Sequence, residues 1–395
     1  IAVPAGIILS LLVSQSSIAD TIYSLFGTEN LSFFYNFNEK WITVSQFACI
    51  PLIILFIVLA FMGIPLFLVL AGIAYIALSA QGACNIEIIP IKTYEIFKDR
   101  SVAAIPLFTI AGYILSQSRT CERYVKVFNS LFGWFRGGTV VAAVIVTTFF
   151  STFTGVSGIT ILALGSLLSI MLVGSGYSQE RAEGLITASG AIGLLFPPSA
   201  AIIMYATTNY FGLMDESIEA IDLFKAAIIP GLIMALSMIV MGIVYDKQTE
   251  RPKFSIKEIG TSVLHCIPEL LMPVFICVFY FSGIFDLFEV AAFAVIYAFV
   301  ITTFIRKDFT LKKSFEVVAS SVPVSGGVLF ILGAASGISY LMLITNVPYF
   351  LNDFVTTYIH SKFVFLLLMN ICLLIVGCLM DMFSAILIVS PLLLP

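Results

Sequence analysis

Two short stretches of the sequence carry residues whose types and spacing could bind small ions. In the stretch SGAIGLLFPPS, Ser189 and Gly193 precede the adjacent prolines Pro197 and Pro198, and Ser199 follows them. Each proline removes a backbone donor and costs about 3 kcal/mol in a helix interior. A helix broken here frees carbonyl oxygens, which suit a small cation, and exposes a helix N-terminus, which attracts anions. The alternative is a proline that only kinks the helix.

The second stretch, TGVSGIT, contains Gly155, Ser157, Gly158 and Thr160. Small residues allow close approach of another backbone, so we expect this stretch to meet the proline break. The two together would form an oxygen cage of the size of a sodium ion, beside a position that favours a carboxylate.

The composition places these stretches in a membrane. Of 395 residues, 60% are hydrophobic and 11% are charged, and the mean hydropathy is +1.09. A soluble domain carries about a quarter charged residues, and apolar runs of about 20 residues cross a bilayer. The sequence therefore predicts an all-α polytopic membrane protein whose charges lie in loops. No basic tract indicates nucleic acid, and seven scattered cysteines without a CxxC pair indicate neither disulfides nor a metal site.

The loop charges predict a topology in which residues 137–177 enter and leave the membrane on one side. Basic loops near 119–136, 246–257 and 306–313 are expected inside, and acidic loops at 209–222 and 285–289 outside. The middle of 137–177 is rich in Ser, Thr and Gly, which a lipid-facing span avoids. This favours a re-entrant helical hairpin with its tip at Gly155 to Gly158 over two short full spans.

The C-terminal part shows a similar pattern in the opposite orientation. A helix over 322–345 is expected to cross outward, and the following segment carries Gly377 and Asp381 within an apolar run. An intramembrane acid usually marks a pathway, although it can also bond to neighbouring backbone in a buried bundle. PLFTIAG (106–112) matches VLFILGA (328–334), and the same offset of roughly 220 residues places Gly155 on Gly377. We expect inverted repeats with two re-entrant hairpins and a site at the membrane midplane.

The sequence resembles a known transporter family in three stretches: FTGVSGITILALGSLL, GYSQERAEGLITASGAIGLLFPPSAAIIMYA and NICLLIVGCLMDMFSAILIVSPLLLP. They are similar to the DctM-type large membrane subunit of TRAP (tripartite ATP-independent periplasmic) transporters, from about residue 50 to 395. The resemblance implies an elevator-type secondary transporter in the bacterial inner membrane. It also implies sodium as the coupling ion, an organic acid as solute, a periplasmic solute-binding protein and a small DctQ-type membrane subunit as partners.

The resemblance also implies roles for individual residues. Sodium ligands would come from Gly155, Ser157, Gly158, Ser189, Gly193, Pro197, Gly377 and Asp381. Contacts to the solute would come from Ser157, Thr160, Pro198, Ser199 and Asp381. Many members have SSTIG where this chain has SGAIG, and a second motif of the T-P-P type is not found before residue 395. The chain is therefore expected to be incomplete at its C-terminus.

The expected organisation has five parts. They are an N-terminal membrane segment (1–49) that could be the remnant of a fused small subunit, scaffold helices (50–136), the first hairpin and broken helix of a transport domain (137–211), scaffold helices with amphipathic connectors (212–321), and the second-repeat helix and hairpin (322–395).

Other functions remain open at this stage. One is a different sodium- or proton-coupled carboxylate carrier of the same superfamily. Another is an intramembrane serine hydrolase with Ser157 as nucleophile and His265 or His360 as base, although both histidines are expected near membrane surfaces. No P-loop motif is present for an ATP-driven transporter, and no polar ring indicates a channel. The solute stays open among dicarboxylates, sialic-acid-like sugars, keto acids and amino acids.

Overall fold

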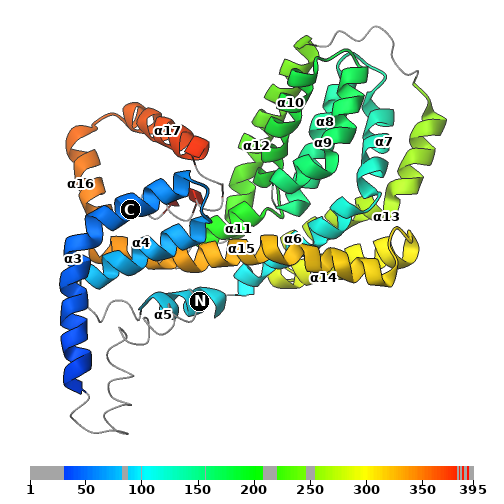
Figure 1. Cartoon of the computed structure of the whole chain (residues 1–395). Helices are drawn as coiled ribbons and strands as arrows, with labels where there is room; N and C mark the ends of the chain where they lie inside the picture. The colour runs from blue at the N-terminus through cyan, green and yellow to red at the C-terminus, as the bar shows by residue number, and fades with distance from the viewer. Residues whose placement is uncertain are drawn as a thin grey trace. The chain divides into compact units, whose positions relative to one another are not determined.

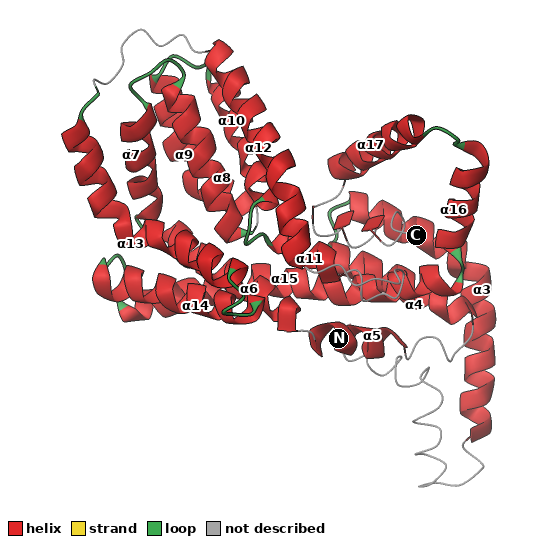
Figure 2. Ribbon diagram, turned by 180° about the vertical axis from the view of Figure 1, so that it is seen from behind, coloured by secondary structure: helices red, strands yellow, loops and turns green. Residues whose placement is uncertain are grey.

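The protein is helical wherever its structure is described. The computed structural model describes residues 31–81, 88–98, 100–155, 157–207, 220–245 and 254–379, together with 382, 385–386 and 389–390. Every regular element in these ranges is a helix (Figure 1; Figure 2 shows the same chain from behind). The predicted all-α class is therefore confirmed.

Several of these helices are long and apolar enough to span a membrane. Six qualify among the described residues: Ile42–Phe61, Ser157–Gly174, Ala220–Tyr245, Ile256–Phe281, Leu287–Ile305 and Leu311–Met342. Two bent helix pairs, Arg100–Gln117 with Thr120–Phe132 and Gln179–Leu195 with Ala200–Ala206, raise the number to as many as eight. The prediction of a polytopic membrane protein is confirmed.

The chain divides into two compact units, and the division falls within helix α15 (Leu311–Ile344). The first unit contains α3 (Leu31–Phe61), α4 (Leu66–Gln81), α5 (Ile88–Lys98), the end of α15, α16 (Val347–Tyr358) and α17 (Lys362–Leu379). The second contains α6 (Arg100–Gln117), α7 (Thr120–Phe132), α8 (Gly138–Thr154), α9 (Ser157–Gly174), α10 (Gln179–Ile192), the 3₁₀ turn η3 (Gly193–Leu195), α11 (Ala200–Thr207), α12 (Ala220–Tyr245), α13 (Ile256–Phe281), α14 (Leu287–Val300) and the π-helical turn η5 (Ile301–Ile305). The predicted scaffold and transport domains concern which parts move, and they stay a prediction.

The second unit is built around the hairpin of α8 and α9. Helix α10 packs on both arms of the hairpin, and α12 packs on α8 and α10, so the four helices lie side by side in both views (Figures 1 and 2). Helix α6 packs along α14 and also contacts α8, α9 and α11, while α7 joins α8 to α13. The hairpin and α11 are thus packed against helices that are distant in sequence, while one face of α9 stays exposed at Leu162 and Ile170.

The first unit has its own small core. Helix α4 packs on α3, and the buried Leu78 of α4 contacts a set of partly buried residues: Tyr75, Ile89, Tyr340, Leu341 and Ile344. Helix α5 is held to α15 by the Thr93 hydroxyl, which donates to the Gly333 carbonyl at 3.1 Å. A side chain at Gly333 would collide with Thr93, so this glycine permits the close approach of the two helices.

A buried ion cluster corrects the expectation that all charges lie in loops. Glu269 of α13 is 1% exposed and accepts from Arg123 of α7 and Arg306, each at 2.8 Å. The other guanidinium nitrogen of Arg123 lies 2.6 Å from Asp308. Arg123 was expected in a loop but lies in α7, whereas Arg306 lies in the loop that follows η5, as expected. Two carboxylates compensate the charge of these side chains, which offsets the cost of their partial burial.

Helix α15 begins earlier than the sequence predicts. The outward-crossing helix was expected over 322–345, but α15 starts at Leu311. The Thr310 hydroxyl accepts from the backbone N–H of Lys313 at 3.4 Å, so Thr310 satisfies a donor of the first turn. Part of the predicted basic loop at 306–313 is therefore helical.

Candidate functional site

The hairpin turns at a glycine. Helix α8 ends at Thr154, Gly155 adopts the left-handed conformation with φ of +64°, and its N–H donates to the Ser151 carbonyl at 3.0 Å. Helix α9 then starts at Ser157. Across the turn, the hydroxyls of Thr154 and Thr160 are hydrogen-bonded at 2.8 Å, and both side chains are buried. The predicted helical hairpin with its tip at this position is present. Whether it is re-entrant in a membrane stays a prediction.

The helix after the hairpin is broken at the prolines, as the sequence predicts. Helix α10 ends at Ile192, η3 tightens the chain, and Phe196 is extended before Pro197 and Pro198. The chain continues as α11 at an angle of 44° to the first part. Ser199 precedes α11, and its buried hydroxyl accepts from the Ala201 N–H at 3.2 Å. The simple kink is therefore excluded, because the α-helical hydrogen bonding stops before the prolines and restarts after them.

The hairpin and the break are in direct contact. The Thr152 hydroxyl shares its hydrogen between the Gly193 carbonyl at 3.0 Å and the Thr148 carbonyl of its own helix at 2.9 Å, and the Ser151 hydroxyl donates to the Gly190 carbonyl. A Cβ atom at Gly193 would lie 2.8 Å from the Thr152 nitrogen, so only glycine fits there. At the tip, a Cβ atom at Gly155 would lie 2.9 Å from the Cβ of Ala200. Glycines on both sides thus bring the two backbones together.

The contact surface on α8 is a stripe of oxygen-bearing residues. Thr148, Ser151 and Thr152 are spaced so that they share one face of the helix, and Gly155 continues it. The Thr148 hydroxyl is buried and, within the described part of the chain, has no hydrogen-bond partner. A buried hydroxyl without a partner carries a free-energy cost, so this oxygen is available to a ligand.

The region is rich in oxygen atoms and carries no formal charge. The sequence has no Asp, Glu, Lys, Arg or His from 137 to 178 or from 184 to 207. Hydroxyls that donate to a carbonyl keep lone pairs of their own, and each carbonyl keeps a second one. Carbonyl and hydroxyl oxygens are ligands for hard cations, and the start of α11 beside Ser199 favours an anion. The arrangement can therefore hold a small cation and an acidic group close together.

The predicted site residues lie at different places around this contact. Gly193 is in its centre, and Gly155 at the tip lies against Ala200, the residue after Ser199. The buried Ser189 hydroxyl donates to the Ile186 carbonyl of its own helix at 3.1 Å. In the first turn of α9, Ser157 is half-buried and Gly158 is exposed. At the break, Pro197 is half-buried and Pro198 is buried.

The residues of α8 that make the contact were not among the predicted site residues. The partner of the break was expected at the hairpin tip, whereas Ser151 and Thr152 contact the break from the last turn of α8. The spacing of Thr148, Ser151, Thr152 and Gly155 on one helical face was the signal that could have found them.

The second predicted hairpin is described only in part. Gly377 lies near the end of α17, where it is exposed and has no atom within 4 Å of its Cβ position. Asp381 lies outside the described residues. The second sodium site therefore stays a prediction.

Comparison with known proteins identifies relatives along most of the chain. A family profile described as the tripartite ATP-independent periplasmic transporter, DctM component, matches residues 53–395. The C4-dicarboxylate TRAP transporter large permease protein DctM of Rhodobacter capsulatus is 30% identical over 86% of this chain and 80% of its own length. The 2,3-diketo-L-gulonate TRAP transporter large permease protein YiaN of Escherichia coli is 27% identical over 75% of this chain and 68% of its own. The isethionate TRAP transporter permease protein DctMQ of Oleidesulfovibrio alaskensis is 26% identical over 84% of this chain and 52% of its own.

Proposed function

Because the chain belongs to the family of DctM components of tripartite ATP-independent periplasmic transporters, we propose that it is the sodium-coupled permease subunit of an organic-acid importer. A TRAP large permease is a multi-pass membrane protein of a binding-protein-dependent secondary transporter. It is a transporter subunit and not an enzyme, which removes the serine hydrolase alternative. Sodium coupling, an elevator movement and the bacterial inner membrane are the parts that we add as proposals.

The contact between the hairpin and the broken helix carries this proposal. Thr152 and Ser151 donate to the carbonyls of Gly193 and Gly190, and the buried Thr148 hydroxyl on the same face of α8 has no partner among the described residues. These groups are neutral oxygens, so a monovalent cation supplies the only formal charge at the site. A sodium ion bound there would hold the hairpin against α10 and order the start of α11.

We propose that the acidic solute binds next to this cation at the start of α11. Ser199 and Thr160 are buried at the tip, and the first peptide N–H groups of α11 complement a carboxylate. The cation reduces the cost of placing this negative charge inside the membrane. Solute binding would thus depend on sodium, which is the thermodynamic requirement for coupled transport.

Two partners belong to the proposal. TRAP large permeases act with a small membrane subunit and a periplasmic solute-binding protein. One relative is named as a single DctMQ permease, which is consistent with a fused or closely associated small subunit. The solute is proposed by class only, as a small organic acid, because the relatives are named for different acids.

Uptake into proteoliposomes tests the proposal. The permease, its small subunit and the binding protein, loaded with its own solute, are expected to accumulate solute under an inward sodium gradient and not under a potassium gradient. Thr152→Val removes the hydroxyl at nearly constant volume. It is expected to raise the sodium concentration for half-maximal uptake about tenfold, because the ion loses one bond to an oxygen ligand. Thr152→Ser should restore the sodium dependence of the wild type.

Thr109→Val is the matched control. Thr109 is a buried threonine of α6 whose hydroxyl donates to the Ile105 carbonyl of its own helix at 2.9 Å. This variant should keep the sodium dependence of the wild type. Equal uptake in sodium and potassium, or an unchanged sodium dependence in Thr152→Val, would count against the proposed function.

A further inference from the structure

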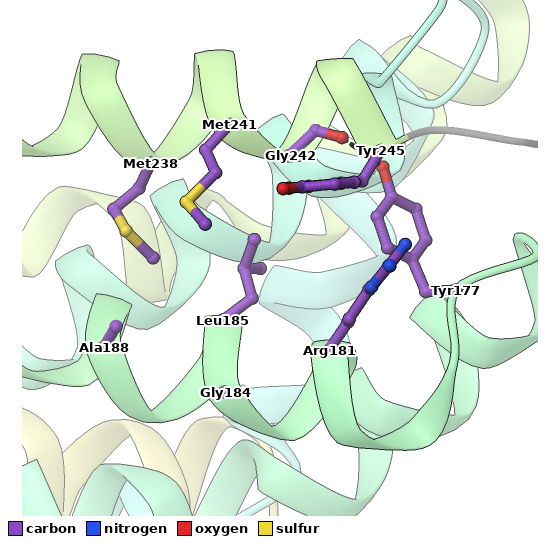
Figure 3. A pocket seen from close by; sticks show the side chains of 9 residues that line it. All are labelled: Tyr177, Arg181, Gly184, Leu185, Ala188, Met238, Met241, Gly242 and Tyr245. Atoms are coloured by element: carbon purple, nitrogen blue, oxygen red, sulfur yellow. Dashed lines mark hydrogen bonds between the residues drawn. The ribbon is translucent and has the colours of Figure 1, made fainter.

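A groove between α10 and α12 lies apart from the contact of the hairpin with the break. Its volume is about 330 Å³. It is lined by Tyr177, Arg181, Gly184, Leu185, Ala188, Met238, Met241, Gly242 and Tyr245 (Figure 3). The residues recur every three or four positions on the two facing helices, so the groove follows the direction of both helices.

One end of the groove is cationic and aromatic. The Arg181 guanidinium lies 4.6 Å from the centre of the Tyr245 ring, and Figure 3 shows it rising between Tyr245 and Tyr177. The Tyr177 hydroxyl donates to the Gly242 carbonyl at 2.6 Å, which fixes that ring against α12. No carboxylate of the described residues forms an ion pair with Arg181. Within the described part of the chain, its charge is therefore not neutralised by a carboxylate, so an external anion would complement it.

The other end of the groove is apolar. Leu185 and Ala188 of α10 face Met238 and Met241 of α12, away from Arg181 (Figure 3). Gly184 has no atom within 4 Å of its Cβ position, so the wall is open there. Met side chains adapt to flexible apolar ligands. A narrow apolar groove of this kind accommodates a hydrocarbon chain.

The cationic and apolar ends of the groove are predicted to lie at the membrane depths that the headgroup and the acyl chain of a lipid would occupy. Tyr245 ends the candidate span α12, and the following segment carries Lys247, Arg251 and Lys253, which predicts the cytoplasmic side. Arg181 and Tyr245 would then lie at the interface, and Met238 and Ala188 would lie deeper in the hydrocarbon. Arginine and tyrosine are typical of the headgroup level.

We propose that this groove binds an anionic phospholipid. Its phosphate pairs with the Arg181 guanidinium, which can donate two hydrogen bonds to phosphate oxygens, and one acyl chain lies along Leu185, Ala188 and Met241. A small polar acid does not match the apolar end, and a zwitterionic lipid lacks the net negative charge that complements Arg181.

The proposed lipid site could affect transport because it lies between two helices that are predicted to belong to different domains. Helix α10 belongs to the segment predicted to move with the transport domain, and α12 belongs to the predicted scaffold. This consequence rests on the proposed function, whereas the binding of lipid does not. A lipid between the two helices would make the transport rate depend on the anionic lipid content of the bilayer.

Thermal unfolding and native mass spectrometry of the purified chain in detergent test the binding. Phosphatidylglycerol is expected to raise the unfolding temperature and to be retained as a bound adduct. Phosphatidylcholine and inorganic phosphate at the same concentrations are expected to do neither. The phosphate arm separates a lipid site from a site for a free anion.

Two variants address the two ends of the groove. Arg181→Gln removes the charge, and Gly184→Leu fills the open wall with a side chain that a helix accepts readily. Each is expected to weaken phosphatidylglycerol binding about tenfold or more. Arg181→Gln loses the charge-assisted bond to the phosphate, and Gly184→Leu loses the space for the acyl chain. Arg181→Lys should keep part of the binding, because it keeps the charge and loses the paired geometry.

Matched controls lie outside the groove. Gly260→Leu changes a helical glycine of α13 that also has no atom within 4 Å of its Cβ position, and Lys257→Gln removes a basic residue on the same predicted side. Both should bind phosphatidylglycerol as the wild type does. Wild-type binding by Arg181→Gln and Gly184→Leu would overturn the proposal, as would equal stabilisation by phosphatidylcholine. Because these measurements use neither sodium nor solute, their failure leaves the proposed function standing.

Discussion

The second unit contains two buried polar regions, and their polar groups are compensated in opposite ways. In the ion cluster, Glu269 and Asp308 carry two negative charges against the positive charges of Arg123 and Arg306, at distances of 2.6 to 2.8 Å. At the hairpin and the break, hydroxyls and carbonyls meet without any charged side chain. In the first region every charged group has a partner of opposite charge, so the cluster can fix α7 against α13 without binding an ion. The second leaves the Thr148 hydroxyl without a partner among the described residues, and its oxygens carry no formal charge.

The largest expected effect is the loss of Glu269. Glu269→Ala leaves Arg123 without one of its two carboxylate partners and Arg306 without its carboxylate, so we expect a destabilisation of about 3–5 kcal/mol. The measurement is thermal or denaturant unfolding of the purified chain in detergent.

Glu316→Ala serves as the comparison for Glu269. Glu316 is 54% exposed and pairs with Lys313 at 3.6 Å, so its loss should change stability by less than about 1 kcal/mol. If both variants lose similar stability, the buried cluster does not fix the helices as described.

A smaller effect is expected from a methyl group at the hairpin contact. Gly193→Ala places a Cβ 2.6 Å from the Cβ of Ser151, so the hairpin must shift away from the break. We expect a destabilisation of about 1–3 kcal/mol, typical of overpacking, together with a large loss of uptake.

Gly158→Ala is the matched variant at the tip, because no atom lies within 4 Å of that Cβ position. It should fold as stably as the wild type. An active, stable Gly193→Ala protein would show that close backbone contact is unnecessary at this place.

The smallest effect on stability is expected at Thr148. Thr148→Val removes a buried hydroxyl that has no partner in the described chain, so stability should stay the same or rise slightly. If that oxygen binds the cation, the sodium concentration for half-maximal uptake should rise about fivefold, the effect of about 1 kcal/mol. An unchanged sodium dependence would assign Thr148 no part in the site and leave Thr152 and Ser151 as its side-chain ligands.

The parts of the fold that follow from local rules could be predicted from the sequence. Pro197 and Pro198 end a helix because they lack N–H groups, so the break was expected. The hairpin was expected from the loop charges and from the Ser, Thr and Gly residues around Gly155. Their contact was expected as well, because small residues occur on both sides.

The details that depend on register and on distant partners could not be predicted. Which turn of α8 meets Gly193 depends on how the helix is rotated in its packing, and the prediction placed the contact at the tip instead of at Thr152. Arg123 and Glu269 are far apart in sequence, and each alone resembles an ordinary charged residue. Their pairing depends on α7 packing against α13, which no local pattern encodes.

The most direct test is the effect of sodium on thermal unfolding of the purified chain without solute. The wild type should unfold at a higher temperature in sodium chloride than in potassium chloride of equal concentration, since an ion that binds the folded state stabilises it. In Thr152→Val this difference should largely disappear, while Thr109→Val should retain it. Equal unfolding temperatures in the two salts for the wild type, or an undiminished difference in Thr152→Val, would contradict a sodium site at the contact of the hairpin with the broken helix.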